Sequence, residues 1–156
     1  ARRARRVLDI GAGSGAAALW MAAGLRQPGG RLVAIERDSA RRTLAAGAIG
    51  RAGLADAVDL RLGDAARLID GLSGRFDVVL FDETAVEREG HLLQLLERDH
   101  VAPRALLCSH GGQLDPVATA RLHAQLQVRP EFAATTSLGV GDGLFVAVAA
   151  PGAAPA

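Results

Sequence analysis

Residues 7–15 read Val-Leu-Asp-Ile-Gly-Ala-Gly-Ser-Gly, and this stretch decides the fold of the chain. Its first four residues indicate a strand, and the strong helix formers of residues 16–23 follow the last glycine. Glycines at alternate positions let a ligand lie directly on the backbone. The amides of the turn and the positive end of the following helix favour an anionic or polar ligand group. The stretch therefore predicts a strand, a ligand-binding turn and a helix.

The carboxylate of Asp9, two residues before the first glycine, helps to decide which class of ligand the turn binds. Dinucleotide-binding folds use the spacing G-x-G-x-x-G, whereas the spacing here is G-x-G-x-G. A carboxylate within the strand can anchor an ammonium group or brace the loop, and it is poorly placed beside a pyrophosphate. The pattern D-x-G-x-G-x-G resembles motif I of the class I S-adenosylmethionine-dependent methyltransferases, whose ligand carries an amino group and a sulfonium. A tight turn without a ligand is the alternative, and the matches further along the chain argue against it.

Composition limits the class of protein. The 156 residues predict one domain over residues 1–150 and a disordered tail over residues 151–156. A net charge of +1 gives no electrostatic reason to expect nucleic acid, and no apolar run is long enough to cross a bilayer. The single cysteine, Cys108, fits a reducing compartment, and no cleavable signal segment is present, so we expect a cytoplasmic protein. All 18 basic residues are arginine, which excludes a lysine base.

Strand and helix patterns alternate along the chain. Strands are expected over residues 7–10, 31–36, 57–62, 76–81, 103–109, 131–138 and 144–149. Helices are expected from residue 16, over residues 38–52, 65–72 and 89–100, and from Asp115 after a turn at Gly111-Gly112. This order predicts an α/β fold with a Rossmann-like, doubly wound, seven-stranded and mostly parallel sheet that ends in an antiparallel hairpin.

Polar residues follow the first four expected strands, and in a parallel sheet they meet at one edge. Glu36 lies about 20 residues beyond the glycine turn, where doubly wound folds place a carboxylate on the ribose hydroxyls. In the methyltransferases a Gly-Asp pair such as Gly63-Asp64 commonly lies near the adenine amino group, although Asp64 is equally suited to cap the next helix. The residues expected to bind the cofactor are Asp9, Gly11, Ala12, Gly13, Gly15, Glu36, Arg37, Gly63, Asp64, Ala65 and Asp82.

From Val7 to Ala149 the chain resembles the catechol and caffeoyl-CoA type O-methyltransferases. The matching segments are VLDIGAGSGAAALWMA, GGRLVAIERD, RAGLADAVDLRLGDA, GRFDVVLFD and the closing PEF…GVGDGLFVAVA. The resemblance implies methyl transfer from S-adenosylmethionine to a hydroxyl of a small molecule, with a divalent metal, usually magnesium, holding two substrate oxygens. Relatives carry helices before the first strand that cover the substrate and help form dimers. A homodimer is therefore one assembly to test, and the resemblance leads us to expect either a fragment or a shortened member of the family.

The catalytic positions that the resemblance implies are only partly kept. Asp82 occupies the position of the first metal-binding acid, but an Asp-Asn pair is replaced by Ser109-His110 and a lysine base by Ala85. A hard cation needs several oxygen ligands, so these residues argue against a magnesium site and we assign no metal ligand. We expect Asp82 and His110 at the reacting end, with His110 as a general base. An ordinary histidine at a strand end is an equally good interpretation.

Two other functions remain open. Asp82, Glu83, Glu87 and Glu89 are similar to the loop in which arginine methyltransferases hold a guanidinium, which would favour metal-independent N-methylation of a cationic amine or guanidine. A solvated helix start is the simpler interpretation of Glu87 and Glu89. The third hypothesis is a domain that binds S-adenosylmethionine without catalysis.

The remaining rare side chains receive structural interpretations. His91, His100 and His123 lack the spacing of metal ligands and are expected at the surface. Trp20 and Met21 lie in the first expected helix and are assigned to the core. Cys108 lies within an apolar strand, which predicts a buried and inert thiol.

Overall fold

The computed structural model describes residues 4–26, 29–83, 85–110, 116–141 and 143–152. The strands are β1 (Arg6–Ile10), β2 (Arg31–Glu36), β3 (Val58–Leu62), β4 (Phe76–Phe81), β5 (Val101–His110), β6 (Phe132–Leu138) and β7 (Leu144–Ala149). The helices are α1 (Ala16–Leu25), α2 (Ser39–Arg51), α3 (Ala65–Ile69), α4 (Ala85–Glu97) and α5 (Pro116–Gln127), with a 3-10 turn at Ala55–Ala57. The expected turn at Gly111-Gly112, the helix cap at Asp115 and tail residues 153–156 lie outside the described residues.

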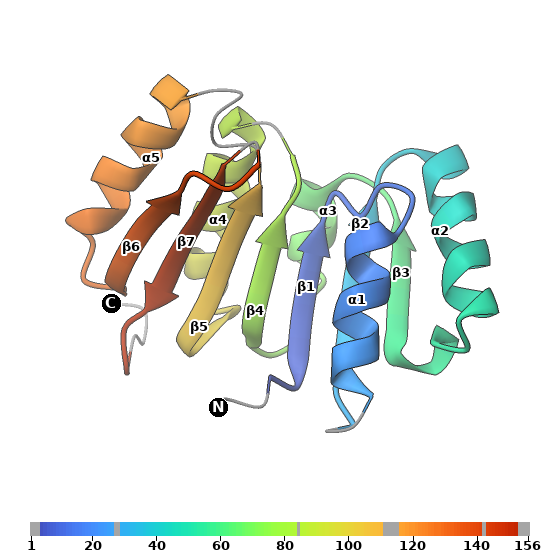
Figure 1. Ribbon diagram of the computed structural model, residues 1–156. Helices are drawn as coiled ribbons and strands as arrows, with labels where there is room; N and C mark the ends of the chain where they lie inside the picture. Colours follow the sequence, from blue (N-terminus) through green and yellow to red (C-terminus); the bar gives the residue numbers. More distant parts are fainter. Residues whose placement is uncertain (1–3, 27–28, 84, 111–115, 142, 153–156) are drawn as a thin grey trace.

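The strands form one sheet in the order β3-β2-β1-β4-β5-β7-β6 (Figure 1). β1 pairs in parallel with both β2 and β4, whereas β7 runs antiparallel to β5 and to β6. The seven-stranded, mostly parallel sheet with a closing hairpin confirms the predicted fold class. After β3 the chain returns to the other side of β1, so the strand order switches direction between β1 and β4. Ligands bind at such a switch point, beyond the carboxyl ends of the strands.

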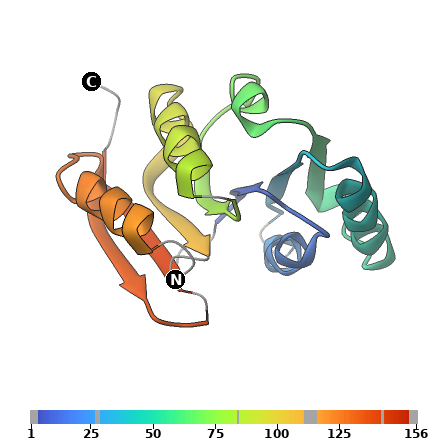
Figure 2. The same ribbon diagram turned by 90° about the horizontal axis from the view of Figure 1, so that it is seen from above.

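Helices cover the two faces of the sheet unequally. Viewed from above, α1 and α2 lie on one face, and α3 and α4 lie on the other (Figure 2). One core contains Ala18, Ala22 and Leu25 of α1, and the other contains side chains of α3, α4 and α5. No described helix lies in front of β4, β5 and β7 (Figure 1). There the aligned side chains of Val78, Leu106 and Val148 stay partly exposed, although all three are apolar.

α4 begins four residues earlier than the sequence predicted and ends three residues earlier. The acidic residues after β4 had indicated a loop, but Glu87 belongs to the first turn of a helix that buries Leu92 and Leu95. The helix ends before Asp99, which has a φ of 57° and so cannot continue a right-handed helix. β5 also starts earlier than predicted, at Val101.

Four single-residue predictions were wrong, one of them that of His91, which is partly buried rather than at the surface. Trp20 is 83% exposed, because the small side chains of α1 face the sheet and Trp20 points the other way. His100 is buried rather than exposed, since its two ring nitrogens lie 3.0 and 3.2 Å from the carbonyl oxygens of Gly74 and Ile69. His123 is half-buried against the ring of Phe145. None of the helices among the described residues is long and apolar enough to cross a membrane.

Candidate active site

The glycine turn after β1 requires glycine for two different reasons. Gly11, Gly13 and Gly15 have φ angles of 89°, 55° and 91°, in the left-handed region that side chains disfavour. A Cβ atom on Gly11 would lie 2.2 Å from the carbonyl oxygen of Asp82. The amides of Gly11 and Ala12 both donate to the carbonyl oxygen of Ile35 at 3.0 Å. The turn is thus fixed between the ends of β4 and β2, as the strand–turn–helix prediction requires.

Glu36 links the end of β2 to this turn. It is only 5% exposed, and its Oε2 atom accepts a hydrogen bond of 2.7 Å from the amide of Gly13. Its Oε1 atom accepts one of 2.8 Å from the amide of Asp38, at the start of α2. Each carboxylate oxygen can accept more than one hydrogen bond, so these contacts leave capacity for ribose hydroxyls. Glu36 therefore braces the glycine turn and also lines a cavity at the carboxyl ends of the strands.

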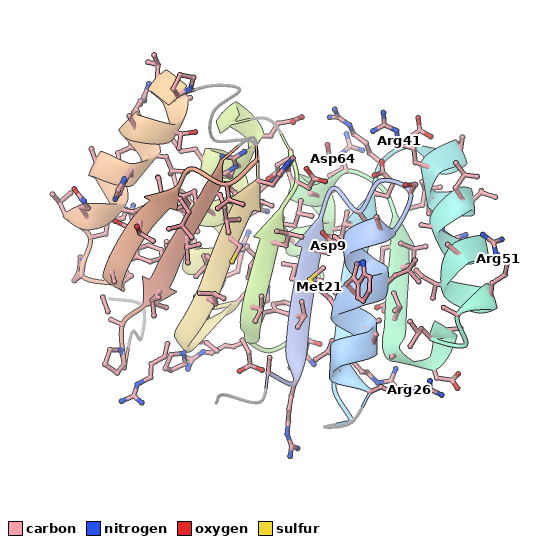
Figure 3. All side chains as sticks on the ribbon, in the orientation of Figure 1. Asp9, Met21, Arg26, Arg41, Arg51 and Asp64 are labelled. Atoms are coloured by element: carbon pink, nitrogen blue, oxygen red, sulfur yellow. The ribbon has the colours of Figure 1, made fainter. Side chains whose placement is uncertain are left out.

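Asp9 lies in the middle of the sheet, below this turn (Figure 3). Its side chain is fully buried, and neither carboxylate oxygen has a hydrogen-bond partner among the described residues. Burial, followed by repulsion from Asp82 and Glu36, raises the pKa of Asp9 to about 7. An unpaired buried carboxylate is costly unless it is protonated or meets a cation. The buried carboxyl of Asp9 therefore favours either its protonated form or a cation close by.

A cavity of about 330 Å³ opens at the carboxyl ends of β1, β2 and β4. Figure 3 shows Asp64 and Arg41 at this edge of the sheet. Seven of the residues predicted to bind the cofactor line the cavity: Gly11, Gly13, Glu36, Arg37, Asp64, Ala65 and Asp82. The other four, Asp9, Ala12, Gly15 and Gly63, are not among the lining residues. Asp64 also caps α3, its Oδ1 atom accepting from the amide of Arg67 at 3.3 Å.

Five carboxylates line this cavity, which makes its charge predominantly negative. They belong to Glu36, Asp64, Asp82, Glu83 and Glu87, and the cavity also contains two arginines and one histidine. The sequence had suggested an anionic or polar ligand group at the turn. In the structure the carboxylates give the cavity a negative potential, which favours a ligand with cationic groups. The amide of Gly13 already donates to Glu36, so it is not available to an anionic ligand.

Two of the lining residues that the sequence analysis interpreted differently, Glu87 and His91, lie on α4. His91 lies 2.8 Å from Glu83 through its Nδ1 atom, and both side chains are nearly buried. The hydrogen bond to Glu83 raises the pKa of His91 against the opposing effect of burial, and the charges of Asp64 and Glu87 act in the same direction as Glu83. Glu87 pairs with Arg37 at 2.7 Å. No pattern in the sequence indicated the contact between His91 and Glu83, because the two residues are eight positions apart and meet only when the segment before α4 packs against that helix.

Asp82 and His110 come together as predicted. Asp82 follows β4, and its amide donates to the carbonyl oxygen of Ile10 at 2.8 Å. His110 is the last residue of β5, and its Nδ1 atom lies 3.5 Å from Oδ1 of Asp82. Both side chains are about half exposed, at 55%. A carboxylate beside Nδ1 can orient the imidazole of a histidine that acts as a general base.

The same region offers a poor set of ligands for magnesium. Asp82 supplies one carboxylate and His110 an imidazole, while the hydroxyl of Ser109 is buried. Mg²⁺ prefers oxygen ligands in octahedral geometry. Across the described part of the chain, no group of three or more His, Cys, Asp or Glu side chains is placed to hold a metal ion. The residues that the structure describes therefore do not fit a magnesium site.

Comparison with known proteins gives a consistent result. A family model described as O-methyltransferase matches residues 2–98. The chain is 30% identical over 160 residues to a catechol O-methyltransferase of Mycobacterium tuberculosis (strain ATCC 25618 / H37Rv), covering 94% of this chain and 72% of that protein.

Solved structures agree with this assignment. The O-methyltransferase TomG from Streptomyces achromogenes, solved with S-adenosylmethionine, is 27% identical and superposes with a TM-score of 0.82 over 95% of this chain and 74% of its own. Cofactor-bound Rv0187 from MTB is 28% identical, with a TM-score of 0.83 over 96% of this chain and 74% of its own. Since the family model spans more than half of the chain and the relative reaches 30% identity over most of both proteins, this chain belongs to the O-methyltransferase family.

Proposed function

We propose that this chain binds S-adenosylmethionine in the acidic cavity beyond β1, β2 and β4, and transfers its methyl group to a hydroxyl oxygen of a small molecule. The observation that carries the proposal is the unpaired, buried carboxyl of Asp9 beneath an anionic cavity. S-adenosylmethionine presents an ammonium and a sulfonium, which such a site attracts. In this proposal Glu36 accepts hydrogen bonds from the ribose hydroxyls, and Asp64 accepts one from the adenine amino group.

The reacting end of the proposed site is formed by Asp82 and His110. His110 accepts the proton of the substrate hydroxyl, and Asp82 orients the imidazole through its Nδ1 side. The bound cofactor supplies an electrophilic methyl group. Transfer forms an O–CH₃ bond and breaks the S–CH₃ bond, with the electron pair passing to sulfur. Alignment of the oxygen with the S–CH₃ bond is then the main requirement. No step of this proposal passes through a metal.

N-methylation of a cationic substrate receives no support from the acidic loop. Glu83 is engaged by His91 and Glu87 by Arg37, at 2.8 and 2.7 Å. A substrate guanidinium would have to displace these cations. The cytoplasmic location and the homodimer remain predictions from the sequence, and light scattering in solution would check the second.

The first test is calorimetric titration with S-adenosylmethionine and S-adenosylhomocysteine, with magnesium and then with a chelator. Wild type is expected to bind in both conditions, and Glu36→Ala is expected to lose binding because it frees the glycine turn. Glu97→Ala, which changes an exposed acid at the end of α4, is the control and should bind as wild type does. Absence of binding by folded wild type would overturn the proposal.

The second test measures transfer of labelled methyl groups to 3,4-dihydroxybenzoate and to 4-hydroxybenzoate. We expect a methoxy product, and we expect His110→Gln to lower kcat by about 10²- to 10⁴-fold while cofactor binding is kept. A protein that binds cofactor but methylates neither these nor other hydroxyl acceptors would support the domain without catalysis. A chelator that abolishes turnover would contradict the metal-independent step.

A further inference from the structure

The two residues at the reacting end lie just beyond the ladder that joins β4 to β5. The last paired residues of this ladder are Phe81 and Ser109. Asp82 donates its amide to Ile10 of β1, and His110 pairs with Leu144 of β7. The β4–β5 ladder therefore does not include these two residues, whose side chains must stay close to each other. A further link between them would fix the distance between the carboxylate and the imidazole.

Arg88 of α4 provides such a link. Its side chain is only 3% exposed. Its Nη2 atom lies 3.0 Å from the carbonyl oxygen of Glu83 and 3.3 Å from the carbonyl oxygen of His110. One guanidinium nitrogen carries two hydrogens, so it can donate one to each carbonyl. Arg88 thus continues the connection between the two strands past the last pair of the ladder.

The chemistry of this contact suits a fixed link. Two carbonyl oxygens are both acceptors and cannot bond to each other, so a donor between them is required. Hydrogen bonds from a cation are about twice as strong as those between neutral groups. The guanidinium stays protonated throughout the range in which a histidine titrates, so the link does not depend on the protonation of His110.

α4 holds the loop after β4 at a second point. His91 lies three residues after Arg88, on the same side of the helix, and binds the carboxylate of Glu83. Arg88 holds the carbonyl of the same residue. Backbone and side chain of Glu83 are therefore both attached to one helix, which is itself packed into the core through Leu92 and Leu95.

We propose that Arg88 is a positioning residue of the methyl-transfer site, whose buried guanidinium holds the ends of β4 and β5 so that Asp82 and His110 face each other. This inference rests on the proposed function for the roles of those two residues. Arg88 does not line the cavity, and in this proposal it acts through the two backbone carbonyls to which it donates.

The experiment compares wild type with Arg88→Met, which keeps the length and apolar stem, and Arg88→Lys, which keeps a cation with several hydrogens. Arg98→Met, at an exposed arginine just past the end of α4, is the matched control. Each protein is crystallised, titrated with S-adenosylhomocysteine, and assayed with labelled S-adenosylmethionine and 3,4-dihydroxybenzoate.

In Arg88→Met we expect the Nδ1 to Oδ1 separation to widen beyond the 3.5 Å of wild type, with the glycine turn unchanged. Affinity for S-adenosylhomocysteine should stay within about twofold, and kcat should fall about 10- to 100-fold, because misplacement by about 1 Å can cost this much. Arg88→Lys should recover part of kcat, and Arg98→Met should match wild type. This division between affinity and kcat would not follow from a general loss of stability.

Three results would overturn the proposal. The first is an unchanged separation in Arg88→Met, and the second is an unchanged kcat in that variant. The third is a parallel fall in affinity, kcat and melting temperature, which would make Arg88 a folding residue only. If Arg88→Met does not fold, the test rests on Arg88→Lys. A changed distance between Nδ1 of His110 and Oδ1 of Asp82 in that variant supports the proposal, and an unchanged distance overturns it. If wild type binds cofactor without turnover, the proposed function fails while the crystallographic comparison still tests the link.

Discussion

Asp9 combines two properties that rarely occur together, full burial and the absence of a hydrogen-bond partner among the described residues. Burial raises the pKa of this carboxyl from 3.8 to about 7, so it keeps its proton at pH values where an exposed aspartate is ionised. Motif I is therefore more than a turn, because it carries a titrating group into the interior. The consequence can be measured without any cofactor.

We expect the stability of wild type relative to Asp9→Asn to fall as the pH rises from about 4 to about 7. The folded state binds more protons at Asp9 than the unfolded state over this range, so the free energy of unfolding decreases with pH. Since one pKa unit corresponds to about 1.4 kcal/mol, the full change is on the order of 4 kcal/mol. Urea denaturation at several pH values measures it. Asp56→Asn, at an exposed carboxylate, is the control. Parallel curves for wild type and Asp9→Asn would refute the argument.

His91 and Glu83 should give a pH dependence of the same sign, but over a higher pH range. The pKa of His91 is raised above 6.5 mainly by its hydrogen bond to Glu83, with further contributions from the charges of Glu83, Asp64 and Glu87. The stabilising contribution of the pair is fully present below pH 6.5 and is lost as the pH rises through the raised pKa. His91→Gln should therefore destabilise the protein more at pH 6 than at pH 9. Equal changes in the denaturation midpoint at both values would contradict this.

Among the elements, the turn between β1 and α1 is the most tightly constrained. Its glycine conformations could be expected from the sequence, but the approach of Gly11 to Asp82 depends on the pairing of β1 with β4. The start of α4, in contrast, was predicted wrongly from the sequence. Its first turn was assigned to a loop from its acidic residues, whereas the structure engages Glu87 with Arg37 and buries Arg88.

Gly11→Ala should weaken binding of S-adenosylhomocysteine at least tenfold and lower the stability. The new Cβ atom would lie 2.2 Å from a main-chain oxygen of Asp82, so the ends of β1 and β4 must separate. Gly53→Ala is the matched control, because Gly53 also has a positive φ, of 65°, but no atom lies within 4 Å of its added Cβ. It should cost only the conformational penalty of about 1–2 kcal/mol and leave binding unchanged. Calorimetry and thermal melting separate the two effects, and similar binding by both variants would contradict the explanation.

At the scale of the whole molecule, the sheet separates two cores of unequal extent. The core under α3, α4 and α5 contains side chains of β1, β2, β4, β5, β6 and β7. The core under α1 and α2 is smaller, and half of its buried residues are alanines. The site lies above the switch between β1 and β4, where both cores end. Stability should therefore depend strongly on side chains that are remote from the chemistry.

Leu95→Ala is expected to lower the free energy of unfolding by about 2–5 kcal/mol, since Leu95 is fully buried in the larger core and its loss leaves a cavity. Leu44→Ala makes the same chemical change at a leucine of α2 that is 63% exposed, and it should cost less than about 1 kcal/mol. Urea denaturation of both variants checks the difference. Comparable losses would mean that the exposed and buried leucines are wrongly assigned.

The sequence by itself determined the order of the elements, the α/β class and the edge of the sheet where the polar residues gather. These follow from local signals, namely apolar periodicity, glycines and helix caps, which act over a few residues. It also brought Asp82 and His110 to the same place, because residues after neighbouring parallel strands must meet. Only the tertiary structure decided the bridge from Arg88 to two strand ends, the pairing of His91 with Glu83, the burial of His100 and the exposure of Trp20. Those contacts join residues from different elements, and whether a polar side chain finds a buried partner depends on packing that no local pattern encodes.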